Sequence, residues 1–303
     1  MRSFLFTVVA AGAFAACACA AASAPELVAK ISVPAGSGPC AAFKGGKFVW
    51  VSLYRGNALL RIDPTTNKVV GRTKTGYGPC GMGFGAGSVW IEDTGSSTIS
   101  RVSATTGRRT AAIRVGPQPY DATYAFGAAW ATTFSGGTVE RINPRTNKVV
   151  KAIKVGAGPA GVVGAFGSVW AGLQGDSVVV RINPRTNRAV ARIKVIAATW
   201  MAASADAIWI TQPSLGMVSR IDPTTNAVTA TVKVGAQPGD PAVVGTDLWV
   251  PSVKDNSVAV VDTGTNTVRE TLPVGKGPFV VTEIAGEAWI PSWQGNDVWR
   301  MRP

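Results

Sequence analysis

Three acids, Glu92, Asp93 and Asp121, are the residues of this 303-residue chain that are best suited to chemistry. Carboxyl groups brought together can perform acid–base catalysis or hold a hard cation through oxygen ligands. The chain has no histidine, which excludes a Ser-His-Asp or Cys-His pair and an imidazole metal ligand. The three acids therefore form either a small catalytic group or a set of solvated loop charges, and we assign no catalytic and no metal-binding residue.

Seven tryptophans recur along the chain at a period near 40 residues, which indicates a repeat protein. They are Trp50, Trp90, Trp130, Trp170, Trp209, Trp249 and Trp289. Between clusters of Gly, Pro and Asn lie runs of about six residues rich in Val, Ile and Ala, which is the length of a strand. We expect each unit to form four short antiparallel strands, called a to d, with its tryptophan in the core.

The turn between strands c and d has a recurring sequence, seen in full as Asn183-Pro184-Arg185-Thr186-Asn187. Its first residue can cap the turn through its side chain, and its proline presets φ. Its last residue is Asn or Gly in six units, and these residue types tolerate positive φ. The positions are Asn67, Gly107, Asn147, Asn187, Asn226 and Asn266. We therefore predict a left-handed residue at each of them and interpret the motif as structural.

Seven units of four antiparallel strands, with no helical pattern after the N-terminus, predict an all-β seven-bladed β-propeller. The last unit, from about Gly277, reaches Pro303 after only three strands. The missing fourth strand matches residues 28–33, whose pattern resembles that of residues 150–155. We expect this N-terminal strand to complete the last blade and close the ring, which removes two exposed edges. The propeller would occupy residues 25–303 as one domain.

The repeat unit combines Val-Gly-x-x-Pro, a tryptophan in its second strand and Arg-Ile-Asp/Asn-Pro-x-Thr-Asn. It resembles the YVTN-type propeller repeat of bacterial envelope and secreted proteins over almost all of the mature chain. More distantly, the chain resembles the streptogramin B lyase (virginiamycin B lyase) group, which is also seven-bladed. That resemblance implies a magnesium-assisted elimination that opens a cyclic depsipeptide. The implied chemistry uses histidine, which this chain lacks.

Residues 1–24 have the features of an export signal. Arg2 supplies the positive charge, residues 4–16 are apolar but too short to span a bilayer, and small residues follow. We expect cleavage after Ala20 or Ala22 and a periplasmic or secreted protein. Lipoprotein anchoring through Cys17 is the alternative. No later apolar run reaches the length of a membrane span.

Cys40 and Cys80 follow Gly-Pro pairs at the same place in consecutive units. On neighbouring inner strands their Cα atoms would be roughly 6–7 Å apart, near the upper limit for a disulfide. An oxidising compartment favours the bond, and two unpaired thiols are the alternative. Two cysteines without a histidine do not make a zinc site.

The repeat also assigns the loops to the two faces of the ring. The d–a and b–c loops share the face that holds the mouth of the central channel, and these loops vary in size and polarity as a binding surface would. Solvated loop variation is the alternative. We predict that this face binds a small polar ligand with a flat or apolar part, or a partner such as an envelope protein. The predicted contacts are Glu92, Asp93, Tyr120, Asp121, Asp176, Trp200, Asp240, Asp255 and Trp293.

Trp200 is the main contact in this prediction because the fifth unit has lost its Val-Gly-x-x-Pro pattern there, reading Val195-Ile196-Ala197-Ala198-Thr199-Trp200 instead. A large ring then enters the mouth where the fourth unit has Ala160. Plugging of the channel is the alternative role for this side chain.

The net charge of +13 has two components. One arginine recurs in strand c of six units, which we expect to spread charge round the ring and favour solubility: Arg61, Arg101, Arg141, Arg181, Arg220 and Arg300. A second group occupies the c–d turns of units two to four, on the face opposite the mouth: Arg108, Arg109, Arg145, Lys148, Arg185 and Arg188. We predict that this basic sector makes weak, non-specific contact with polyanions, because no aromatic residues interleave it as single-strand binding requires.

These observations predict an exported, non-enzymatic and monomeric binding protein without a cofactor. Two alternatives stay open. One is a lyase or hydrolase that uses the mouth carboxylates with Mg²⁺, and the other is a polyanion binder that acts through the basic sector.

Overall fold

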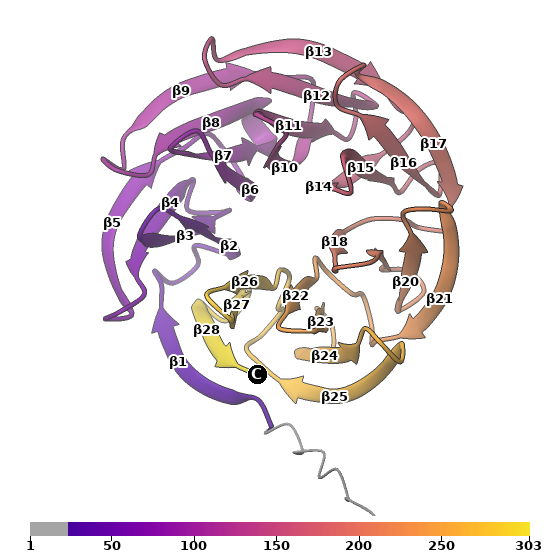
Figure 1. Ribbon diagram of the computed structural model, residues 1–303. Helices are drawn as coiled ribbons and strands as arrows, with labels where there is room; N and C mark the ends of the chain where they lie inside the picture. Colours follow the sequence, from indigo (N-terminus) through magenta and orange to yellow (C-terminus); the bar gives the residue numbers. More distant parts are fainter. Residues whose placement is uncertain (1–23) are drawn as a thin grey trace, which may run out of the picture.

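The computed structural model describes residues 24–303 as a ring of seven four-stranded antiparallel sheets around a central channel (Figure 1). The predicted seven-bladed β-propeller is confirmed. All of the predicted export signal except residue 24 lies outside the described residues. Within residues 24–303, no helix is long and apolar enough to cross a bilayer.

In the first four blades the strands follow one another from the channel outward. Blade one holds β2 (Pro39–Gly45), β3 (Phe48–Leu53), β4 (Ala58–Asp63) and β5 (Lys68–Lys74). Blade two holds β6 (Pro79–Gly85), β7 (Ser88–Asp93), β8 (Thr98–Ser103) and β9 (Arg109–Arg114). Blade three holds β10 (Pro119–Ala125), β11 (Ala128–Thr133), β12 (Thr138–Asn143) and β13 (Lys148–Lys154). Blade four holds β14 (Pro159–Ala165), β15 (Ser168–Leu173), β16 (Val178–Asn183) and β17 (Arg188–Lys194).

The last three blades have shorter inner strands, of three residues each. Blade five holds β18 (Met201–Ala203), β19 (Ile208–Gln212), β20 (Met217–Asp222) and β21 (Ala227–Lys233). Blade six holds β22 (Ala242–Val244), β23 (Asp247–Ser252), β24 (Ser257–Asp262) and β25 (Thr267–Pro273). Blade seven holds β26 (Thr282–Ile284), β27 (Glu287–Ser292), β28 (Asp297–Arg302) and the N-terminal β1 (Glu26–Ser32). The helical element in the described chain is a single 3₁₀ turn, η1 (Thr94–Ser96), in the b–c loop of blade two.

The N-terminal strand closes the ring as predicted. β1 pairs antiparallel with β28, placing Ile31 opposite Val298, and Figure 1 shows β1 as the outer strand beside the C-terminus. The paired edges of β1 and β28 are thereby covered.

The c–d turns have the predicted left-handed residue. The asparagines at this position have φ between 53° and 59°, and Gly107 has φ of 74°. This shared conformation explains why only Asn and Gly occupy the position.

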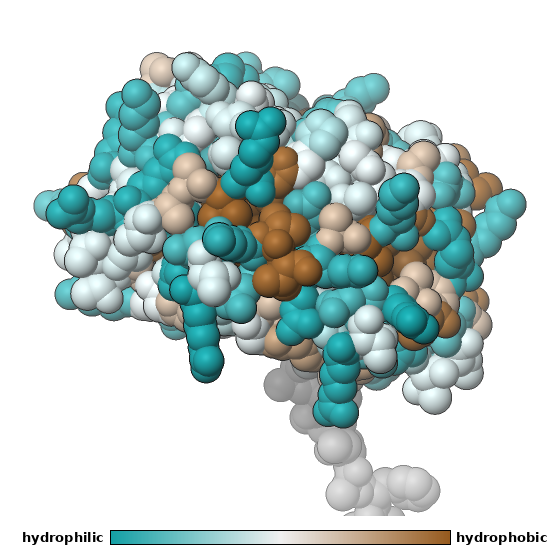
Figure 2. Space-filling view, turned by 90° about the horizontal axis from the view of Figure 1, so that it is seen from above, coloured by the Kyte–Doolittle hydropathy of each residue, from teal (hydrophilic) through white to brown (hydrophobic). Residues whose placement is uncertain are grey.

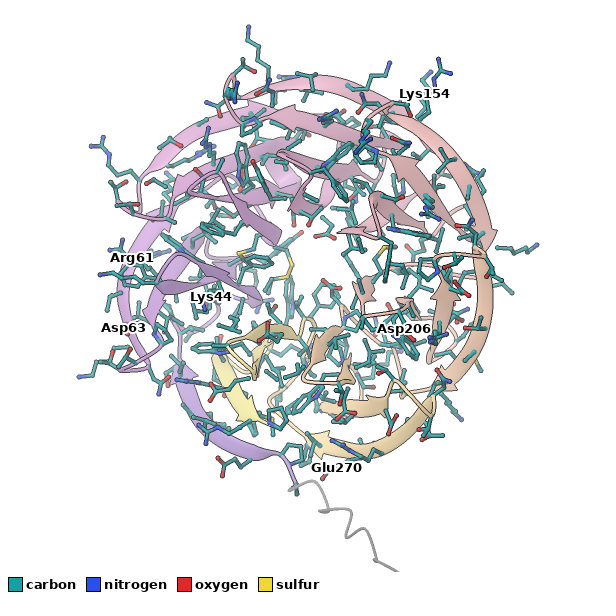
Figure 3. All side chains as sticks on the ribbon, in the orientation of Figure 1. Lys44, Arg61, Asp63, Lys154, Asp206 and Glu270 are labelled. Carbon is teal, nitrogen blue, oxygen red and sulfur yellow. A yellow bond between two sulfur atoms is a disulfide. The ribbon has the colours of Figure 1, made fainter. Side chains whose placement is uncertain are left out.

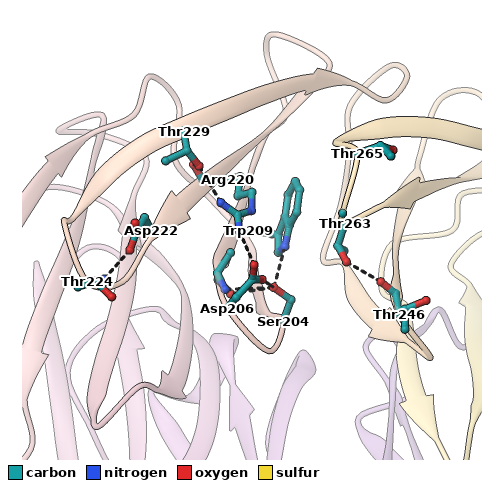
Figure 4. Close-up of polar contacts among 12 residues, drawn as sticks. Ser204, Asp206, Trp209, Arg220, Asp222, Thr224, Thr229, Thr246, Thr263 and Thr265 are labelled. Atoms are coloured by element: carbon teal, nitrogen blue, oxygen red, sulfur yellow. Dashed lines mark hydrogen bonds and ion pairs between the residues drawn. The ribbon is translucent and has the colours of Figure 1, made fainter.

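The seven periodic tryptophans are fully buried, each at 0 % exposure, as predicted. In the first four blades the indole N–H donates to the carbonyl oxygen five residues earlier, for example Trp50 to Gly45 at 3.0 Å. In blade five, Trp209 donates to the Ser204 hydroxyl at 3.2 Å instead (Figure 4). The tryptophan therefore joins strands a and b as well as filling the core.

The recurrent arginine of strand c joins neighbouring blades. Arg141 stacks 5.4 Å from the centroid of Trp130 and donates from Nη1 to the Pro184 carbonyl at 2.9 Å and the Asn187 side chain at 3.2 Å in the next blade. Arg101, Arg181 and Arg300 repeat this arrangement. We call it the arginine clasp. These arginines therefore join blades in addition to the predicted role of spreading charge round the ring.

Arg220 shows what happens when the next blade lacks the proline turn. The turn that follows it reads Thr263-Gly264-Thr265-Asn266. Arg220 instead donates to Asp206 at 2.5 Å within its own blade, and Thr263 donates to the Thr246 carbonyl at 2.7 Å (Figure 4). The Asn-Pro turn thus acts as the receptor for the clasp as well as a tight turn.

The rim of the ring is made by the outer strands. Figure 2 shows this edge, where apolar side chains lie among projecting hydrophilic ones. The exposed valines on outer strands are Val69, Val70, Val150, Val190, Val228 and Val268. Their scatter round the rim is ordinary for exposed apolar residues.

We predict that Arg141→Ala lowers the free energy of unfolding by about 2 kcal/mol, because it removes hydrogen bonds from a charged donor and leaves buried acceptors unpaired. Chemical denaturation of both proteins checks this. The matched control is Arg145→Ala in the exposed turn, which should change the free energy by less than about 0.5 kcal/mol. Equal effects in the two variants would show that the clasp contributes nothing.

Candidate functional site at the channel mouth

A pocket of about 220 Å³ opens at the channel mouth, and we call it the mouth pocket. It is lined by Cys40, Tyr54, Cys80, Glu92, Thr94, Gln118, Tyr120, Trp200, Phe279 and Trp293. These residues begin the inner strands or follow strand b, which is why the propeller brings them together from blades one, two, three, five and seven. Figure 3 shows inner-strand side chains converging on the channel, with the disulfide bond on its wall.

Five aromatic rings of the pocket form a continuous chain of contacts, the aromatic arc: Tyr54, Trp293, Phe279, Trp200 and Tyr120. Successive ring centroids along it are 4.9, 6.2, 5.3 and 5.2 Å apart. Aromatic pairs at such distances stabilise one another by about 0.5–1.5 kcal/mol. The arc is therefore a preformed apolar wall.

Trp200 lies within the arc and is only 6 % exposed. Its ring stacks on Tyr120 with an interplanar angle of 10°. Its backbone N–H donates to the Thr211 hydroxyl at 3.2 Å, as the N–H of Ala41 donates to Ser52 in blade one. The side chain lines the mouth pocket, which is where the prediction placed it.

Glu92 occupies a position where blades one, three and five have a hydroxyl, namely Ser52, Thr132 and Thr211. Two residues after their tryptophans, Ser52 and Thr132 accept the N–H of Ala41 and of Asp121, each at 3.0 Å. In blade two, the Oε1 atom of Glu92 accepts the N–H of Gly81 at 2.9 Å in the same way. Because a hydroxyl suffices in the sibling blades, the fold does not require a carboxyl group here.

Glu92 is fully buried, and burial raises its pKa well above the ordinary range for glutamate. Hydrogen bonds from the Thr94 hydroxyl, at 2.8 Å, and from the Gly81 N–H oppose this rise, while the charges of Asp93 and Asp121 add to it. Burial also raises the pKa of Tyr120, and Glu92 contributes to that shift. The pocket thus contains an acid whose protonation can respond to a ligand.

Asp121 and Asp240 lie deeper, on a second cavity of about 230 Å³ along the channel. Asp121 accepts hydrogen bonds from the backbone N–H of Val162 in the next blade and from that of the adjacent residue Ala122, both at 2.8 Å. Burial raises the pKa of Asp121 to about 7. Burial and the Asp121 charge together raise the pKa of Asp240 well above its ordinary value. The two acids therefore titrate as a pair below the mouth pocket.

Asp93, Asp176 and Asp255, three of the predicted ligand contacts, do not line the mouth pocket. Asp93 accepts the Gly76 N–H at 3.0 Å, and Asp255 accepts the Ala236 N–H at 2.7 Å. Asp176 pairs with Arg192 at 3.0 Å on the surface. The first two acids hold d–a loops in place, and the third makes an outer ion pair, so their side chains turn away from the channel axis.

Four residues outside the predicted contacts also line the pocket: Tyr54, Phe279, Thr94 and Gln118. Signals for two of them were present, since Phe279 follows a Gly-Pro pair like Cys40 and Tyr54 aligns with Trp293 in the unit. The predicted contacts that do line the pocket are Glu92, Tyr120, Trp200 and Trp293.

Cys40 and Cys80 form a disulfide on the pocket wall, joining the inner strands of blades one and two. Their Cα atoms are 5.2 Å apart, closer than the sequence suggested. The bond lies where the aromatic arc leaves a gap between Tyr120 and Tyr54, so it completes the wall together with Glu92.

All six members of the predicted basic sector are exposed at or beside the c–d turns: Arg108, Arg109, Arg145, Lys148, Arg185 and Arg188. Arg109 also lines a groove between blades one and two with Thr75 and Thr98. There its charge lowers the pKa of Asp93 against the effect of burial.

No protein-family model matches the sequence, and no curated protein matches it. Among solved structures, virginiamycin B lyase from Staphylococcus aureus is similar, with a TM-score of 0.81, 17 % identity and coverage of 92 % of this chain and 100 % of that chain. A catalytically inactive histidine-to-alanine variant of that enzyme with quinupristin gives the same values. Hydrazine synthase of Kuenenia stuttgartiensis gives a TM-score of 0.76 and 16 % identity, with coverage of 88 % and 96 %. At such low identity the likeness shows the propeller fold alone.

We predict a pH effect for Asp240→Asn. Both channel acids have raised pKa values when folded, so the folded protein binds more protons than the unfolded chain between the ordinary pKa of 3.8 and about 7 for Asp121. The free energy of unfolding therefore falls as pH rises through this window. Asp240→Asn removes the repulsion between the ionised carboxylates of Asp121 and Asp240. It should therefore raise the free energy of unfolding at pH 8 by about 1 kcal/mol, with little change at pH 4, where the acids are protonated in the folded protein.

Urea denaturation at several pH values measures this, with the surface variant Asp176→Asn as control. An effect of Asp240→Asn that is the same at every pH would contradict the coupling of the two acids.

We predict that replacing both Cys40 and Cys80 with serine lowers the free energy of unfolding by roughly 2–4 kcal/mol, because the crosslink restricts the unfolded chain. Denaturation without reductant measures the loss in the free energy of unfolding. Reduction of the disulfide in the unmodified protein should lower the free energy of unfolding by a similar amount. A denaturation midpoint that reductant leaves unchanged would show that the thiols are unpaired.

Proposed function

We propose that this chain is an exported, non-enzymatic binding protein that holds a small ligand in the mouth pocket. The observation that carries the proposal is the convergence of the aromatic arc and the buried acid Glu92 from separate blades on one pocket. The rings offer flat apolar surface and the acid offers one polar group. This combination is typical of sites for small molecules.

The size of the pocket supports a small occupant. Its volume of about 220 Å³ is below the roughly 300–1,000 Å³ of pockets that enclose drug-sized ligands. One chemical group, such as a sugar ring, an amino-acid side chain or a substituted amine, fills such a space. The remainder of a larger ligand would lie over the variable b–c loops.

The proposed location is the periplasm or the exterior of the cell. The signal features of residues 1–24 and the disulfide of Cys40 with Cys80 support it, because disulfides persist in oxidising compartments. The unit sequence further supports placing the chain among the YVTN-type repeat proteins of the envelope. The ring is closed, and each of its seven sheets has four strands from this one chain, which supports a monomer.

A lyase is the second candidate, because a buried acid with a raised pKa is what general acid catalysis requires. The residues present do not fit a magnesium ion. Glu92 and Asp121 line separate cavities and already accept protein hydrogen bonds, and residues 24–303 contain no group of three acids or cysteines that could hold a metal. We therefore favour binding over elimination.

Polyanion binding through the basic sector is the third candidate. Its support is the set of exposed cations at the c–d turns, and it predicts binding that weakens steeply with salt.

We predict that one member of a ligand panel raises the melting temperature of the mature protein, because a ligand at one hundred times its Kd stabilises the folded state by about 2.7 kcal/mol. The panel holds sugars, peptides, amines, a cyclic depsipeptide, divalent cations, and heparin at two salt concentrations. The shift should be lost in Trp200→Ala and in Glu92→Gln, and kept in the control Asp176→Asn.

A shift that both mouth variants retain would contradict a site at the mouth. A heparin shift that vanishes at high salt would favour the basic sector, and a metal-dependent product from the depsipeptide would favour the lyase.

A further inference from the structure

The central channel of this basic protein is lined by acidic side chains. The mouth pocket and the deeper channel cavity are lined by Glu92, Asp121 and Asp240. Among residues 24–303, no lysine or arginine lines either cavity, although the sequence contains 30 of them. The positive charge of the described residues therefore lies outside these two cavities.

Glu92 has no cationic partner in the part of the chain that the structure describes. None of the ion pairs there includes it, and its two oxygens accept only from the neutral donors Gly81 and Thr94. Buried acids are normally paired with a cation, and a carboxylate has more acceptor sites than these two bonds use. The pocket is complementary to a positive charge that the protein does not supply.

The aromatic arc adds a second attraction for a cation, through the negative faces of its rings. One cation of the protein already uses the arc at its rim, where the guanidinium of Arg55 lies 5.4 Å from the centroid of Trp293. Arg55 is held there by donating to the carbonyl oxygens of Gly36 at 3.0 Å and Trp293 at 3.1 Å, and it does not line the mouth pocket. The interior side of the pocket remains open to a ligand.

We propose that the mouth pocket binds a small quaternary alkylammonium group against the aromatic arc, close to the buried carboxyl group of Glu92. The inference rests on the proposed function and names its ligand class. A quaternary ammonium donates no hydrogen bonds, so it suits a wall made mostly of rings. A primary amine has three donors to satisfy and fits this lining less well.

Proton release should accompany binding. The titratable and charged groups that face Glu92 are Asp93, Asp121 and Tyr120, with Tyr54 beside Tyr120 and Arg55 at the rim. Burial raises the pKa of Glu92, and a bound cation lowers it by favouring the charged form. Binding below the pKa of the free protein therefore displaces a proton.

The test is calorimetric titration of the mature protein with choline and with its neutral carbon isostere, in which a tert-butyl group replaces trimethylammonium. Two buffers that differ in ionisation enthalpy report the proton. Choline should bind at least about tenfold more tightly than the isostere, with proton release. Glu92→Gln should abolish the release and weaken choline binding by about tenfold or more, and Asp176→Asn should leave both unchanged.

Glu92→Thr is the second variant, because Thr132 occupies the equivalent position in blade three and the Gly81 N–H keeps its acceptor. An unchanged melting temperature with lost choline binding would support the proposal even if Glu92→Gln folds poorly. Unchanged choline binding in Glu92→Thr would overturn it.

Two further outcomes would overturn the proposal. Equal binding of choline and the isostere, lost in Trp200→Ala, would make the pocket an apolar site and keep the proposed function. Binding of neither compound at about millimolar concentration would reject the cation site, and the ligand panel would then decide the proposed function independently.

Discussion

The arginine clasp is the interaction on which the rest of this propeller depends. A fully buried tryptophan fixes strands a and b within a blade, and an arginine stacked on that tryptophan binds the Asn-Pro turn of the next blade. The clasp recurs at four of the seven junctions between neighbouring blades, and the pairing of β1 with β28 completes the last blade. The ring in turn sets the spacing of the inner strands and hence the width of the channel.

The clasp and the c–d turns lie toward one face of the ring. The loops of the opposite face take part in few of these contacts between blades. The consequence is visible at the channel mouth, where equivalent positions hold a disulfide, large rings or small residues. Some mouth-face acids still have structural duties, and Asp93 and Asp255 hold loops through backbone N–H groups. Glu92 differs from them because a hydroxyl in its place serves the sibling blades.

The outer surface and the channel differ in charge and therefore in the ligands that they favour. The outside is basic and solvated, which favours solubility and weak attraction to anions. The channel is lined by buried acids and aromatic rings, where a low dielectric makes each electrostatic contact stronger. The likeness to virginiamycin B lyase and hydrazine synthase is one of fold, which does not determine the site.

The sequence alone determined the blade count, the buried tryptophans, the left-handed turn residues and the closing strand, because each is a local pattern repeated in register. It also placed Tyr120, Trp200 and Trp293 at the mouth. Tertiary structure decided which side chains meet there. The register of the repeat assigns a loop to a face, but a side chain's direction depends on contacts with the next blade. Glu92 therefore lines the pocket while the side chain of its neighbour Asp93 bonds a loop. The clasp arginines bind turns in the next blade of the ring, which for Arg300 is the first blade of the chain.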